Sequence, residues 1–131
     1  MNLPLEKDMK FGWMTSMDNL AAVKQTTKLA DEIGMDSLWV GDHIAFAVPI
    51  MDPLLQLAQA AALSDRLILG TSVFLLPLRH PTTVAKQVST LDRLTDGRLI
   101  FGVGIGGEFP NEFAACGCMT RYPAFAVARG F

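Results

Sequence analysis

Apolar residues follow two alternating patterns along the chain, short continuous runs and longer stretches with helical spacing. The runs cover residues 9–14, 37–41, 67–76 and 99–103. The last two runs lack the polar/apolar alternation of a half-exposed strand, and such runs are typical of parallel strands that are buried on both faces. The pattern therefore predicts four short strands in a mostly parallel sheet.

A stretch with helical spacing follows each of the first three runs. The first predicted helix has Asp18 as its N-cap and ends at Gly34, where a left-handed residue costs least. Its predicted apolar stripe consists of Val23, Thr26, Ala30 and Ile33.

Prolines mark the beginnings of the later helices. The second predicted helix begins at Pro53, with Asp52 as N-cap, and extends to about Leu63. The third begins at Pro81, and a short fourth one runs from Pro110 to Gly117. The third helix has an apolar stripe formed by Val84, Val88, Leu91 and Leu94.

A strand recurs about every 30 residues with a helix after it, which is typical of a (β/α)8 TIM barrel or a doubly wound α/β sheet. A complete barrel needs about 250 residues, and this chain has four such units. We therefore predict part of a TIM barrel, an open parallel half-barrel with strand order 1-2-3-4. Residues 1–117 form the predicted barrel domain, and residues 118–131, which lack a helical stripe, form a divergent C-terminal tail.

Composition excludes several classes of protein. The chain of 131 residues is 50% hydrophobic and has a net charge of −2, with no basic face for a nucleic acid. Cys116 and Cys118 have neither the spacing of a zinc site nor a disulfide framework, so we predict no metal. The N-terminus lacks the order of a signal peptide and no apolar run reaches the ~20 residues of a membrane helix. We expect a soluble cytoplasmic protein.

Three polar side chains are predicted at the carboxyl ends of the strands, where α/β proteins build their active sites. These are His43, Ser72 and Glu108. Taken alone, His43 would more often be a surface or core residue and Glu108 an exposed loop acid, so their shared location carries the prediction. His80 precedes Pro81, and we interpret it as a structural residue at the start of a helix.

The glycines after the fourth strand satisfy the dinucleotide pattern G-x-G-x-x-G at Gly102, Gly104 and Gly107. That fingerprint needs an acidic residue about 20 positions later, and none follows Glu112. The glycines are better explained by close approach of a ligand or a neighbouring backbone to the strand end. Motifs of hydrolases, phosphotransferases and metalloproteases are absent from the sequence.

The segment LGTSVFLLPLRHPTTVAKQVSTLDRLTDGRLIFGVGIGGEFPNEFAACG, together with VGDH at residues 40–43, resembles the luciferase-like monooxygenase family. The resemblance covers residues 9–117. It implies a (β/α) barrel that uses FMN or a deazaflavin coenzyme and acts on a small-molecule substrate that the sequence does not name. The wording GEFPNEF favours the deazaflavin branch.

The resemblance also implies roles for individual residues. His43 would line the reactive face of the flavin ring, and Glu108 would be an active-site acid. Ser72 and Val73 match a strand bulge whose non-prolyl cis peptide backs the ring, so we expect a bulge or a cis bond there. Gly104 and Gly106 complete the predicted cofactor site.

The sequence departs from the family after Gly117, where relatives continue through four more units. We therefore expect a truncated oxidoreductase with impaired activity that binds the cofactor weakly by itself. The alternatives are a non-catalytic half-barrel that pairs with another chain or with itself through open sheet edges, and an inactive fragment.

Overall fold

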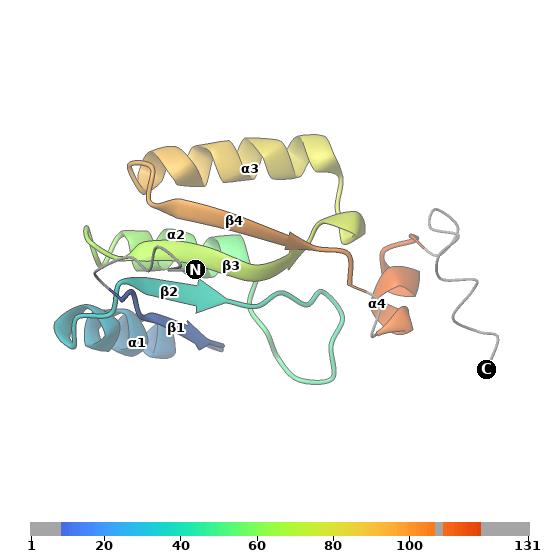
Figure 1. Cartoon of the computed structure of the whole chain (residues 1–131). Coiled ribbons are helices and arrows are strands. Elements are labelled where there is room, and N and C mark those ends of the chain that lie inside the picture. Colours follow the sequence, from blue (N-terminus) through green and yellow to red (C-terminus); the bar gives the residue numbers. More distant parts are fainter. Residues whose placement is uncertain (1–8, 107–108, 119–131) are drawn as a thin grey trace, which may run out of the picture.

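The computed structural model describes residues 9–106 and 109–118, which form one sheet with helices between successive strands (Figure 1). The strands are β1 (Gly12–Thr15), β2 (Ser37–Val40), β3 (Ile68–Leu75) and β4 (Leu99–Gly104). The helices are α1 (Leu20–Glu32), α2 (Pro53–Ala61), the short 3₁₀ helix η1 (Leu76–Leu78), α3 (Pro81–Leu94) and α4 (Pro110–Ala115). The sheet is parallel throughout with order β1-β2-β3-β4, which confirms the predicted architecture.

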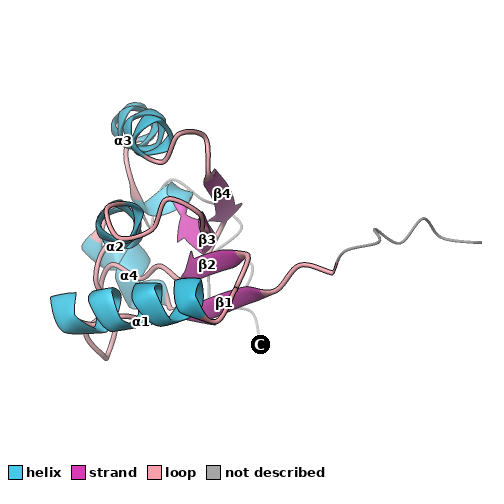
Figure 2. Cartoon of the chain, turned by 90° about the vertical axis from the view of Figure 1, so that its left-hand side faces the viewer, coloured by secondary structure: helices cyan, strands magenta, loops and turns pink. Residues whose placement is uncertain are grey.

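Helices α1, α2 and α3 lie on one face of the sheet (Figure 2). The core fills the space between this helical layer and the strands, where Leu38, Val40 and Leu69 are fully buried with Val23 and Leu57. Burial of this apolar surface supplies the main driving force for the fold.

The opposite face of the sheet carries no helix among the described residues (Figure 2). Met14, Trp39, Gly70 and Ile100 form one row across this face by strand register. Met14 and Ile100 are 55% and 45% exposed. The prediction that the strands are buried on both faces is therefore correct only for the helical face, because the described helices all pack on that side.

Helix α1 begins one residue later than predicted. Asn19 is its N-cap and accepts a 2.9 Å hydrogen bond from the amide of Ala22, so the assignment of Asp18 was wrong. Asp18 instead accepts a 2.7 Å hydrogen bond from the Asn19 side chain. At α2 the predicted N-cap is confirmed, since Asp52 accepts from the amides of Leu54 and Leu55, and this helix ends at Ala61 rather than Leu63.

Two predicted stripe residues are exposed at the ends of their helices. Ile33 is 55% and Leu94 is 65% exposed. In both helices the residues that face the core are spaced by four and then three positions. They are Val23, Thr27 and Ala30 in α1, and Val84, the half-buried Val88, Leu91 and Thr95 at α3. A period of 3.6 residues explains why Thr95, and not Leu94, continues the buried side.

The predicted C-terminal tail lies outside the described residues except for its first residue. Cys118 is buried, and its thiol donates a 3.4 Å hydrogen bond to the carbonyl of Pro77. Short helix α4 is thereby held against the segment that follows β3.

Candidate functional site

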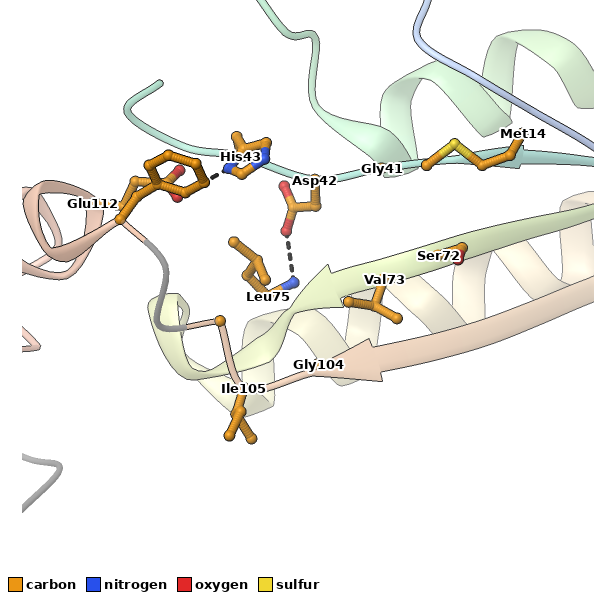
Figure 3. A pocket seen from close by; sticks show the side chains of 12 residues that line it. Met14, Gly41, Asp42, His43, Ser72, Val73, Leu75, Gly104, Ile105 and Glu112 are labelled. Carbon is orange, nitrogen blue, oxygen red and sulfur yellow. Dashed lines mark hydrogen bonds and ion pairs between the residues drawn. The ribbon is translucent and has the colours of Figure 1, made fainter. Parts of the chain in front are cut away.

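A cavity of about 390 Å³ opens at the carboxyl ends of the strands (Figure 3). The predicted site residues that line it are His43, Ser72, Val73, Gly104 and Gly106. Residues from β1, β3, the end of β4 and the segments that follow β2 and β4 thus meet at one edge of the sheet. The predicted acid Glu108 lies outside the described residues, so its place in this cavity stays a prediction.

The end of β2 is anchored by a buried ion pair. The Asp42 side chain is fully buried and binds the Arg79 guanidinium through both carboxylate oxygens, at 2.5 and 2.8 Å. Asp42 also accepts a 2.8 Å hydrogen bond from the amide of Leu75 at the end of β3 (Figure 3). Arg79 lies 4.1 Å above the ring of Phe74, and its attraction to Asp42 outweighs burial and raises the pKa of Arg79. This pair fixes the backbone from which His43 projects.

His43 contacts a buried carboxylate that comes from helix α4. Its Nδ1 lies 2.9 Å from Oε2 of Glu112, whose side chain is only 2% exposed (Figure 3). The other oxygen, Oε1, accepts hydrogen bonds from the amides of Ile44 at 2.7 Å and Ala45 at 3.2 Å. Glu112 therefore ties α4 to the loop that follows β2.

The surroundings of Glu112 favour its charged form. Burial alone would raise the pKa of this carboxyl, but the His43 hydrogen bond and the amides of Ile44 and Ala45 outweigh it and lower the pKa below its ordinary value. The carboxylate is therefore ionised at neutral pH.

Aromatic rings restrict the His43 side chain. The ring of Phe46 stacks on it, with centroids 4.0 Å apart and an angle of 14°. The edge of Phe109 contacts both rings, at 5.3 Å from His43 and 4.7 Å from Phe46. These contacts leave the imidazole 25% exposed on the cavity wall.

The predicted irregularity in β3 is present. The peptide bond between Ser72 and Val73 is cis, and the register between β3 and β4 shifts between Thr71 and Phe74. The Thr71 hydroxyl donates a 2.8 Å hydrogen bond to the carbonyl of Gly102 across this interruption. Both predictions, the bulge and the cis bond, are confirmed.

The strand β4 approaches this bulge so closely that only glycine fits. A Cβ on Gly104 would lie 2.4 Å from Cγ2 of Val73, and one on Gly102 would lie 2.3 Å from the carbonyl oxygen of Thr71. The sequence left open whether a ligand or a neighbouring part of the chain approaches these glycines. At Gly102 and Gly104 the neighbouring strand β3 makes the close contact.

Sequence reasoning missed Glu112, Asp42 and Arg79. Asp42 directly follows a predicted strand, so the rule that selected His43 would also have selected it. Glu112 lies on the short helix α4 rather than at the end of a strand. Only the fold brings it to His43. Arg79 carries no local signal for its partner.

Other kinds of site find no support in the part of the chain that the structure describes. No group of three or more His, Cys, Asp or Glu side chains is arranged to hold a metal ion within residues 9–106 and 109–118. Within those same ranges no helix has both the length and the apolar character to cross a membrane.

Four β/α units in sequential order, with a cavity at the carboxyl ends of the strands, define part of a TIM barrel. Residues 9–125 match the family described as luciferase-like monooxygenase. The chain belongs to this family of flavin- or F420-dependent oxidoreductases.

The relatives include a monooxygenase and an F420-dependent dehydrogenase. The chain is 44% identical over 83 residues to 4-hydroxyprotoasukamycin monooxygenase of Streptomyces nodosus subsp. asukaensis, covering 63% of this chain and 22% of that protein. It is 37% identical over 113 residues to F420-dependent glucose-6-phosphate dehydrogenase of Beutenbergia cavernae, covering 79% of this chain and 33% of that one.

A solved structure supports the fold. The oxygenating constituent of 3,6-diketocamphane monooxygenase from Pseudomonas putida, in complex with FMN, superimposes with a TM-score of 0.74 at 23% identity. The match covers 84% of this chain and 33% of that chain. The present chain thus spans about a third or less of the length of these three proteins.

Proposed function

We propose that this chain binds the ring system of a deazaflavin coenzyme in its cavity and belongs to an oxidoreductase that uses this coenzyme. The observation that carries the proposal is the meeting of His43, the Ser72–Val73 segment of β3 and the end of β4 around one cavity. Active sites of (β/α) barrels lie at this end of the strands.

The exposed side chains of the cavity fit a flat, largely apolar ring with polar edges. Met14, Val73 and Ile105 present 55%, 41% and 82% of their surface. His43 and the exposed hydroxyl of Ser72 add polar groups at the rim. Apolar walls with a few placed polar groups are typical of cofactor sites.

When bound, a deazaflavin or flavin supplies hydride or electron transfer. The protein's part is then to orient the ring and to move protons. His43 is the proposed proton-exchanging residue, since an imidazole ring can both donate and accept a proton and His43 lines the cavity. Glu108 remains the predicted active-site acid beyond the described residues.

The deazaflavin is favoured over FMN by the extent of similarity. The F420-dependent relative from B. cavernae aligns with 79% of this chain, against 63% for the S. nodosus monooxygenase. A monooxygenase that uses FMN is the second candidate, and the higher identity of the shorter match supports the monooxygenase part of this alternative. The proposed substrate is a small molecule in either case.

Chemical-shift mapping of the isotope-labelled chain tests this function. We expect added F420 to shift the amide signals of His43, Ser72, Val73 and Gly104, and to do so at lower concentration than FMN. Arg98, at the opposite end of β4, provides an internal control whose amide should not move. Residue-level mapping detects a site even if the affinity is weak. If neither cofactor moves the cavity amides, the proposed function is wrong.

A further inference from the structure

The two oxygens of Glu112 have different partners, and this division determines how His43 is protonated. Oε1 accepts hydrogen bonds from the amides of Ile44 and Ala45, which are permanent donors. Oε2 lies 2.9 Å from Nδ1 of His43. An ionised carboxylate can only accept, so Nδ1 must carry the hydrogen.

The second ring nitrogen, Nε2, lies on the other edge of the imidazole. In Figure 3 the His43 ring points one edge at Glu112, while its other edge faces away from the carboxylate. Stacking on Phe46 and the edge of Phe109 hold the ring in this orientation. His43 lines the cavity, and Nε2 is its ring nitrogen that Glu112 does not engage.

We propose that Glu112 is a positioning residue that fixes neutral His43 as the Nδ1–H tautomer and presents Nε2 to the cavity as a hydrogen-bond acceptor. The ligand group recognised there then carries an N–H or O–H hydrogen. The inference deepens the proposed function and rests on it only for the identity of the ligand. Imidazole tautomers are generally set in this way by the partner of the opposite nitrogen.

The described charge next to His43 in the sequence has other partners. Asp42, the adjacent residue, directs its carboxylate to Arg79 and to the amide of Leu75. Glu112 is therefore the carboxylate that bonds His43 within the described residues.

The substitution Glu112→Gln makes a sharp prediction because glutamine has only one accepting oxygen. Two backbone amides already require an acceptor, so the oxygen should stay with Ile44 and Ala45 and the NH₂ group should face Nδ1. A donor facing Nδ1 reverses the tautomer, which moves the hydrogen to Nε2. Glu112→Met is the second variant, which removes the acceptor at similar length and should leave His43 without a fixed tautomer.

The measurement is a two-bond ¹H–¹⁵N correlation spectrum at about pH 8.5, above the ordinary range of histidine. The chain has only two histidines, and a His80→Gln variant assigns both signals and serves as the matched control. We expect Nδ1–H in the wild-type protein and in His80→Gln, and Nε2–H in Glu112→Gln. Nε2–H in the wild-type protein, or an unchanged tautomer in Glu112→Gln, would overturn the proposal. The wild-type spectrum alone shows which ring nitrogen of His43 carries the hydrogen. The proposal can therefore be refuted even if Glu112→Gln fails to fold.

Adding F420 separates this inference from the proposed function. We expect the ligand to shift the Nε2 signal of wild-type His43, and Glu112→Gln to weaken binding by about tenfold, as expected for one lost hydrogen bond. Equal affinity of both proteins would overturn the positioning role. If the tautomer reverses as expected but F420 shifts no cavity signal, the Glu112 contact is supported and the proposed function fails.

Discussion

Two buried carboxylates join segments that are distant in the sequence. Asp42 connects the end of β2 to the amide of Leu75 and to Arg79. Glu112 connects α4 to the amides of Ile44 and Ala45. Each carboxylate is desolvated and each is fully occupied by donors, which is the condition under which a buried charge is tolerated.

At the residue scale, we predict that Asp42→Asn destabilises the fold by about 3 kcal/mol, because it leaves the half-buried guanidinium of Arg79 without its main counter-charge. Urea denaturation would measure the change. The matched control is Asp31→Asn, which removes the exposed ion pair with Arg66 and should cost no more than about 1 kcal/mol. Equal losses in the two variants would contradict the assigned importance of the buried pair.

Among the elements, the helices are defined most clearly by their beginnings. Prolines at the first positions of α2, α3 and α4 supply a preset backbone angle, and side-chain oxygens cap α1 and α2. Adjacent polar residues make the start of α1 ambiguous from sequence, since Asp18 and Asn19 are both good N-caps. The structure selects Asn19, whose oxygen reaches the amide of Ala22.

This selection leads to an element-scale prediction. Asn19→Ala should lower the free energy of unfolding by about 1 kcal/mol, because it leaves an amide of the first turn without an acceptor. Asp18→Ala is the control, and it should change stability by less than about 0.5 kcal/mol. Thermal unfolding of both variants provides the comparison, and a larger loss in Asp18→Ala would restore the original assignment.

The whole molecule is a sheet with one covered face and two edge strands, β1 and β4, within the described residues. Ile68 and Ile100 are 37% and 45% exposed on the face that lacks helices. Exposed apolar surface next to unpaired strand edges favours association. We propose self-association through this face and these edges, which is also the arrangement that a non-catalytic half-barrel would use.

Sedimentation velocity over a wide range of concentration tests the association. We predict that Ile100→Lys weakens it by at least about tenfold, because a charge would be placed on the contact face. Ile33→Lys is the control, since Ile33 is 55% exposed at the end of α1 and should leave association unchanged. A chain that remains monomeric at every concentration would refute this proposal.

Sequence by itself determined the order and type of every main element. Apolar runs gave the four strands, and spacing together with prolines gave the helices. These signals are local, because each depends on a few neighbouring residues and on the period of one element. Resemblance to a family added what periodicity cannot show, namely the irregular β3 at Ser72–Val73 and the importance of His43.

Tertiary structure alone decided which face of the sheet is covered and which side chains meet. The partner of His43 is 69 positions away on a short helix, and the partner of Asp42 is 37 positions away. Pairings of this kind depend on how elements pack, and packing is a property of the whole chain rather than of any segment.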